Sequence, residues 1–278
     1  MTQPLLAELV TGTAVGAAGL IDVNVTTSRW PFRRVPLDEP AKLAAALESC
    51  GVTEAWVGSF DALLHRDMGA VNARTAEDCQ RFGGGKWRAV GCVNPKLPDW
   101  QDDLRRCHEG HGMFAIRLHP NYHAYTLSDP ECLELLSAAA GRGLLVQIAL
   151  SMEDVRTQHP LCPAPRTDHA PLKKILQDIP ELRVMTLNMF HGARVESASA
   201  IALPSRVWFD IATLEGVEGV AKLVTATSAD SVVLGSLAPL FYPEAVHLKL
   251  SESGLPDSTL QHIRVTNPTA AGSQNRER

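Results

Sequence analysis

The 278-residue sequence lacks several features that would each point to a class of protein. No run of about 18 apolar residues occurs, so no segment predicts a membrane-spanning helix. The six cysteines are scattered without a CxxC pair and indicate neither a zinc finger nor a disulfide framework. No glycine-rich phosphate fingerprint follows the first predicted strand, which argues against a dinucleotide-binding fold.

Positive charge is also scarce, because 26 Lys and Arg residues stand against 31 Asp and Glu residues, for a formal net charge of −5. No basic surface therefore argues for nucleic acid as a partner. The start of the chain lacks the basic segment of a secretory signal peptide, since no Lys or Arg precedes Arg29 and Glu8 interrupts the first apolar stretch. Together with the scattered cysteines, this favours a reduced, cytoplasmic protein.

What the sequence does contain is a regular alternation of two patterns. Short apolar stretches rich in Val, Ile and Leu, typical of strands buried on both faces, alternate with helical patterns. The predicted strands are residues 19–26, 54–59, 87–94, 114–119, 144–150, 183–189, 207–212 and 232–236. The predicted helices are residues 39–50 (with Asp38 as N-cap), 61–82, 99–108, 129–140, 171–178, 193–202, 217–225 and 244–251.

Eight such repeats in a chain of this length predict an α/β fold, a closed (β/α)8 or TIM barrel, rather than an open sheet. Apolar residues make up 45% of the chain, enough for one large core. We therefore expect one domain over residues 1–278, with the barrel core at about 18–268. Residues 269–278, "TAAGSQNRER", are expected to form a flexible tail.

Read in order, the strand ends resemble the amidohydrolase-related branch of the amidohydrolase superfamily. "LIDVNV" resembles the opening IDxHxH motif, "VVLGSLAPLFYPEA" the GSDxP region of the eighth strand, and "HIRVTNPTAA" the closing helix. The similarity covers about residues 20–268. That branch contains metal-dependent hydrolases and decarboxylases of small carboxylates, so the resemblance implies an amidohydrolase-like TIM barrel with its site at the C-terminal ends of the strands.

The resemblance also shows where the metal ligands of the family fall in this chain. They fall on Asn24, Thr26, Ala149, Asn188 and Leu237. Asn and Thr are poor zinc ligands, and Ala and Leu have no ligating atom. We therefore expect no metal at this position and no cofactor. A displaced metal site is the alternative, built from loop residues His119, His123, His159, Cys162 and His169.

The loop after the first strand, "TTSRWPFRR", places three arginines around two aromatic residues. Arg29, Arg33 and Arg34 predict an anion-binding lid, since guanidinium groups suit carboxylate and phosphate. The alternative is aromatic packing of Trp30 and Phe32 over the barrel end, with the arginines in solvent.

Two further segments carry candidate site residues. In "IRLHPNY", Arg117 and His119 lie two residues apart near the end of the fourth strand, so Arg117 is predicted to bind an anion and His119 to transfer a proton. The alternative is a buried Arg117 paired with an acid such as Asp210. The amides of Asn24, Asn94 and Asn188 are expected to add neutral hydrogen-bonding groups around the barrel axis, as further substrate-binding residues.

The segment "SMEDVRTQHP" directly follows the fifth strand. Glu153 or Asp154 with His159 is the predicted acid/base set, and Arg156 is a predicted substrate-binding residue. A solvated helix start would also account for the two acids, because acidic residues favour a first helical turn.

Two functions remain open at this level. The first is a hydrolase or lyase that acts on a small anionic carboxylate without the usual metal. The second is a catalytically inactive pseudoenzyme that binds a small anion or a partner protein. A homo-oligomer is compatible with either function.

Overall fold

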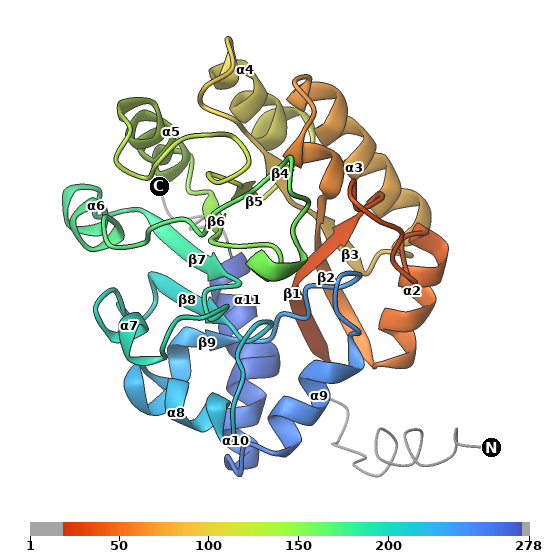
Figure 1. The fold of residues 1–278 in the computed structure, drawn as a ribbon, viewed down its shortest axis with the longest axis vertical. Helices are drawn as coiled ribbons and strands as arrows, with labels where there is room; N and C mark the ends of the chain where they lie inside the picture. The colour runs from red at the N-terminus through yellow and green to blue at the C-terminus, as the bar shows by residue number, and fades with distance from the viewer. Residues whose placement is uncertain (1–18, 274–278) are drawn as a thin grey trace.

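The computed structural model describes residues 19–273, which form a ring of parallel strands with helices outside it (Figure 1). The strands pair in the orders β1-β2-β3 and β4-β5-β6-β7-β8-β9. Their bounds are β1 (Leu20–Thr27), β2 (Val52–Ser59), β3 (Trp87–Ala89), β4 (Gly91–Cys92), β5 (Ala115–Leu118), β6 (Leu145–Ala149), β7 (Arg183–Leu187), β8 (Val207–Asp210) and β9 (Val232–Val233).

Two junctions close the ring. β3 and β4 are the halves of one barrel strand, interrupted at Val90, whose N–H donates to Val57 O over 2.9 Å. β9 and its extension meet β1, where Leu237 N donates to Asn24 O over 2.8 Å and Val25 is bridged in parallel to Ala238. Counting β3 and β4 together gives eight barrel strands, so the predicted TIM barrel is confirmed.

The helices follow the strands in the predicted alternation and surround the barrel (Figure 1). Their bounds are α2 (Pro40–Ser49), α3 (Met68–Phe82), α4 (Trp100–Arg105), α5 (Pro130–Gly141), α6 (Leu172–Asp178), α7 (Glu196–Ser199), α8 (Gly219–Ala226), α9 (Glu244–Ser251), α10 (Asp257–Gln261) and α11 (Asn267–Gly272). Within residues 19–273, none of them combines the length and hydropathy that a membrane crossing requires. All six cysteines are free thiols.

Two local predictions about helices were wrong. The N-cap of α2 is Glu39, and its side chain makes no cap bond. Asp38, the predicted N-cap, does not cap the helix, because its carboxylate is bonded to the guanidinium of Arg34. The helix predicted over residues 193–202 is reduced to the four residues of α7. A loop carrying Gly192, whose φ of 72° lies in the left-handed region, precedes it.

The apolar core has two parts that meet at the strands. One cluster contains strand residues such as Val57 and Val146 together with helix residues such as Leu43 and Leu136, so it lies between barrel and helices. The second contains alternate strand residues, among them Trp56, Leu145, Met185 and Trp208, and fills the barrel itself. This alternation along each strand is what a parallel sheet covered on both faces requires.

The C-terminal helix belongs to the core, which corrects the expected tail over residues 269–278. Residues 269–272 are the last turns of α11, and Ala271 is completely buried in the cluster that fills the barrel. The backbone at Gly272 lies against the indole of Trp56. Residues 274–278 lie outside the described part of the chain.

Gly272→Ala tests this contact. A Cβ at residue 272 would lie 2.8 Å from Cζ2 of Trp56 and 2.9 Å from Nη1 of Arg88. We expect the free energy of unfolding to fall by about 1–3 kcal/mol, because the buried ring cannot move freely. The matched control is Gly141→Ala, since a Cβ in that α5 residue meets nothing within 4 Å. Urea denaturation of both variants checks this, and equal stability would mean that α11 does not pack as described.

Candidate functional site

The polar centre of the barrel mouth is a bonded set of two amides and one carboxylate. Nδ2 of Asn24 donates to Oδ1 of Asn188 over 2.8 Å and to Oδ2 of Asp210 over 2.7 Å. The backbone N–H of Asn188 donates to Oδ1 of Asp210 over 2.8 Å, and Nδ2 of Asn188 donates to the carbonyl of Ser151. These side chains come from β1, the end of β7 and β8, and all are buried. Asn24 and Asn188, which were expected to bind substrate, are thus bonded to each other.

A second carboxylate, Asp22, joins β1 to the extension of β9. Its Oδ1 accepts from the backbone N–H groups of Asn24 and Ser236, over 3.1 and 3.0 Å. Burial raises the pKa of Asp22. Gly235 permits this close approach, because a Cβ there would lie 2.9 Å from Cβ of Asn24 and from Oδ2 of Asp210. The placement of Ser236 against Asp22 therefore depends on a preceding residue without a side chain.

Arg117 lies beneath this set, and its donors are used by the barrel itself. Nε donates to Oε1 of Gln147 over 2.8 Å, and Nη1 donates to Val25 O and to Oγ1 of Thr26, each over 3.1 Å. Nη2 donates to Val23 O and Trp56 O over 3.4 Å. The guanidinium thus meets five protein acceptors and offers no free fork to an anion. This geometry matches the alternative of a buried structural arginine, although its charge partners are not in direct contact.

The charges inside the barrel depend on one another. Burial raises the pKa of Asp210 to about 7, although bonds from Asn188 and Asn24 and the charge of Lys249 oppose the change. Burial lowers the pKa of Arg117 to about 10, while the charges of Asp210 and Asp22 favour its protonated form. Arg117 thus has two acidic charge partners inside the barrel, Asp22 and Asp210, and the pKa of Asp210 lies near neutral pH.

An apolar cluster, which we call the mouth plug, covers the strand ends. It contains the last residue of β6, Ala149, together with Leu237 after β9 and Trp30 after β1. Its remaining buried members are Val35, Phe60, Leu63, Met152 and Ala212. Trp30 stands edge-on to Phe60 with ring centroids 5.1 Å apart. Two positions that the resemblance assigns to metal ligands thus contribute carbon atoms to a packed core.

The loop after β1 packs over the plug and is tied to the loop after β6. Phe32 lies edge-on to Trp30 at 5.3 Å and stacks with the ring of His159 at 6.2 Å. Arg33 forms a 2.6 Å ion pair with the buried Glu153. Arg29 is exposed. Aromatic packing therefore describes this loop better than an anion-binding lid does, since Arg33 already neutralises a carboxylate.

The residues at the family metal position do not fit a transition metal. Ala149 and Leu237 have no ligating atom, and Oδ1 of Asn188 already accepts from Asn24. Thr26 accepts from Arg117, whose positive charge opposes a bound cation. Within residues 19–273, no three His, Cys, Asp or Glu side chains are grouped as a metal ion would require. This includes the displaced set, in which His123 bonds to Ala62 O and His159 is exposed.

The other predicted site residues do not converge on one pocket. Asn94 is buried, and its Oδ1 accepts from the N–H of Lys96 in a local turn. Asp154 and Arg156 pair with each other on the surface at 2.7 Å. His119 is buried beside His123, its Nδ1 has no partner among residues 19–273, and burial lowers its pKa well below the usual range. Glu153, Asp154 and His159 share one loop without forming an acid/base pair.

Sequence reasoning missed Gln147 and Asp22 and gave Asp210 only as a partner for Arg117. Gln147 orients Arg117 and donates to Val23 O over 2.9 Å. A signal existed, because Gln147 is the single polar residue in the apolar run "LLVQIAL", and a buried polar residue must find a partner. The Val23 partner lies more than 100 residues away along the chain and could not be read locally.

Arg117→Met separates a structural from a ligand-binding arginine. We expect the free energy of unfolding to fall by about 3–5 kcal/mol, because carbonyl acceptors and two buried acids lose their cation. Arg29→Met, an exposed control, should change it by less than about 0.5 kcal/mol. Urea denaturation measures both variants. Equal stability of the two would contradict the structural role.

Asp210→Asn tests the raised pKa. An aspartate carboxyl has an ordinary pKa of 3.8, whereas that of Asp210 in the folded protein is about 7, so between these values the folded state binds more protons than the unfolded state. The wild-type free energy of unfolding should therefore fall as pH rises from about 4 to 7, by on the order of 2–4 kcal/mol, and then level off.

The Asp210→Asn variant should lack this decrease in the free energy of unfolding with rising pH, whereas the exposed control Asp257→Asn should keep it. Denaturation at several pH values provides the measurement. A wild-type slope that persists in Asp210→Asn would assign the titration to another group.

Three solved structures show how far this fold is shared. A 2,6-dihydroxybenzoate decarboxylase from Rhizobium is 10% identical with a TM-score of 0.71, covering 92% of this chain and 99% of its own. A dihydroxybenzoic acid decarboxylase from Polaromonas, with manganese and 2-nitroresorcinol, is 11% identical with a TM-score of 0.73, covering 94% and 98%. A 5-carboxyvanillate decarboxylase from Novosphingobium aromaticivorans, with manganese and a nitrobenzoic acid, is 12% identical with a TM-score of 0.72, covering 92% and 96%.

Identities this low establish the fold alone. No curated protein matches the sequence at a significant level. The family model does match, and the match for the amidohydrolase family extends over residues 30–270, from the loop after β1 into α11. This chain is therefore a member of the amidohydrolase family.

Proposed function

We propose that this chain is a catalytically inactive member of its family, which has exchanged the metal centre for a packed interior and acts through binding. One observation carries the proposal. At the position assigned to the metal, Asn24 and Asn188 are bonded to each other and to Asp210, while Ala149 and Leu237 pack in the mouth plug. These residues are buried, so a substrate would meet neither a ligand for a metal nor an open path to one.

The remaining binding capacity lies on the outer loops at the same end of the barrel. Leu161 and Val155, after β6, are 89% and 66% exposed, and Val217, after β8, is 83% exposed. Tyr242, after β9, is 64% exposed. These four side chains lie on loops that follow strands, and a partner protein that covered them would remove apolar surface from water. A small anion is supported less, because Arg33 and Arg34 already pair with carboxylates.

A metal-independent hydrolase or lyase acting on a small carboxylate is the second candidate. The observation in its favour is the likeness in fold to decarboxylases whose names include small aromatic carboxylates. Both candidates predict no metal at the family position, but only the second predicts turnover.

Metal analysis with a decarboxylase panel tests the proposal. Protein purified without added metal should contain far less than one manganese or zinc ion per chain. It should release no CO2 from 2,6-dihydroxybenzoate or 5-carboxyvanillate, with or without added Mn²⁺ or Zn²⁺. Stoichiometric metal that an Asn24→Ala, Asn188→Ala double variant loses would overturn the proposal. Metal-independent CO2 release would favour the second candidate.

A further inference from the structure

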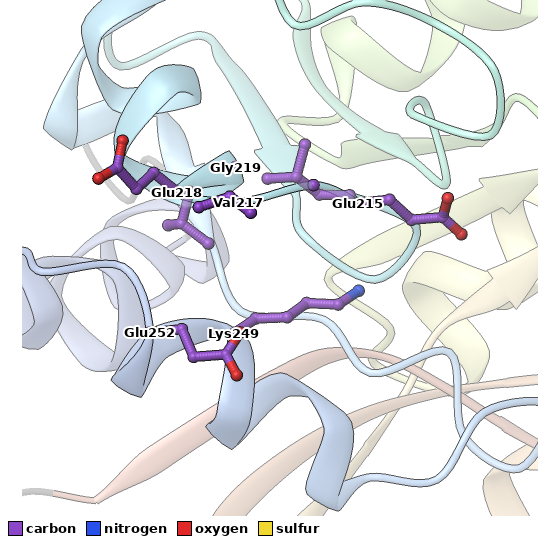
Figure 2. A pocket seen from close by; sticks show the side chains of 9 residues that line it. Glu215, Val217, Glu218, Gly219, Lys249 and Glu252 are labelled. Atoms are coloured by element: carbon purple, nitrogen blue, oxygen red, sulfur yellow. The ribbon is translucent and has the colours of Figure 1, made fainter.

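A cavity of about 370 Å³ lies beside the barrel mouth, off its axis. Its walls are the loop after β8, residues 214–220, and the end of α9 with Lys249 and Glu252. Figure 2 shows Lys249 extending from α9 toward the space that Glu215 borders from the opposite wall. The mouth plug and the amide network contribute no residue to this cavity, whereas Val217, one of the exposed residues considered above for a partner protein, does line it.

The amine of Lys249 is held in a defined position. Nζ donates to the carbonyl of Ile211, over 3.1 Å, and to that of Ala212, both just beyond β8. A neutral amine has two N–H groups and one lone pair, so two carbonyl acceptors can satisfy both donors and leave the lone pair free. Lys249 is one of the residues that line the cavity, which gives a reactant access to it.

Burial, and not the neighbouring charges, favours the neutral form of the amine. Burial lowers the pKa of Lys249, while the charges of Asp210 and Glu215 oppose the change. His191, on the loop after β7, feels the charges of both Glu215 and Lys249, and burial lowers its pKa as well. Its Nε2 is buried without a partner among the described residues. The amine of Lys249 and the carboxylate of Glu215 both line the cavity, whereas His191 is not among its lining residues.

We propose that Lys249 is a nucleophilic amine that forms an imine with a small aldehyde or ketone in this cavity, with Glu215 exchanging the protons. In the first step the lone pair of Nζ attacks the carbonyl carbon, Nζ gives up one of its two protons, and the oxygen takes up a proton to give a neutral carbinolamine. In the second step the carbon–oxygen bond breaks, the oxygen leaves as water after receiving a proton, and Nζ releases its remaining proton. The net change is amine plus carbonyl compound to imine plus water, so no oxidant or reductant is required.

The charge of the cavity selects the substrate class. Glu215, Glu218 and Glu252 line it, and Lys249 is the one basic residue among the lining residues. A carbonyl compound that carries a carboxylate would be repelled by these three acids, whereas a neutral one would not. The inferred ligand is therefore a small neutral aldehyde or ketone, a class unlike the carboxylates named for the family relatives.

Reductive trapping tests the inference. Wild-type protein is incubated with glycolaldehyde and sodium cyanoborohydride, which reduces an imine to a stable secondary amine, and the modified lysines are identified by peptide mass mapping. We expect Lys249 to be labelled several times faster than Lys174, whose side chain is 79% exposed. Glyoxylate, which carries a carboxylate, should label Lys249 more slowly than glycolaldehyde does.

The control variants separate reactivity from accessibility. Lys249→Met should lose the fast-labelling site, and Lys222→Met, on neighbouring α8, should keep it. Glu215→Gln should slow labelling of Lys249 and leave that of Lys174 unchanged. In wild type, the labelling rate of Lys249 should reach half its maximum at a lower pH than that of Lys174.

The wild-type map alone is decisive if Lys249→Met does not fold. Labelling of Lys249 no faster than that of Lys174, or with the same pH dependence, would overturn the proposal and make Lys249 a structural anchor for the end of β8.

Discussion

The guanidinium of Arg117 is the interaction on which the barrel mouth depends. It bonds to backbone carbonyls of β1 and β2 and to the side chain of Gln147 on β6, and so connects strands across the interior. A buried cation of this kind is stable only if its donors are satisfied and opposite charge lies near. Asp22 and Asp210 supply that charge, and Gly58 leaves the space, since a Cβ there would lie 3.0 Å from Nη1.

This arrangement bears on the positions that the resemblance assigns to metal ligands. The resemblance implies that family members hold a metal cation at the strand ends, where it offsets acidic side chains. Here Arg117 supplies a cation in the same interior, and the charges of Asp210 and Asp22 favour its protonated form. Ala149 and Leu237, at two of the positions that the resemblance assigns to metal ligands, pack with Trp30 in the mouth plug. A packed plug is stable where a half-built metal site would leave polar atoms unpaired.

Asp210 belongs to the amide network of the barrel mouth and also affects the pKa of Lys249 in the neighbouring cavity. The carboxylate of Asp210, on β8, accepts hydrogen bonds from Asn24 and Asn188. Just beyond the strand, the carbonyls of Ile211 and Ala212 accept hydrogen bonds from the amine of Lys249. The charges of Asp210 and Lys249 act on each other's pKa. The charge of Asp210 inside the barrel therefore affects the pKa of Lys249, which lies outside the amide network.

The amino-acid sequence by itself determined the barrel. Eight apolar stretches separated by helical patterns allow few other ways to bury both faces of a parallel sheet, and the motif "LIDVNV" with its later counterparts indicated the family. The sequence also suggested that Asn24 and Asn188 lie around the barrel axis, but not that their side chains bond to each other. Local patterns, however, report only a residue's own element and its exposure to water.

Only the tertiary structure decided which residues bond to one another across the barrel. Whether Arg117 faces a ligand or five protein acceptors depends on carbonyls of β1 and β2 that no local pattern places beside it. The pairing of Arg33 with Glu153, 120 positions apart, turned an expected anion site into a tie between loops. Residues 269–272 looked like a tail because they are small, yet small residues are what fits against Trp56 at the barrel end. In each case the physical reason is the same: desolvation and close packing act between residues that only the closed fold brings into contact.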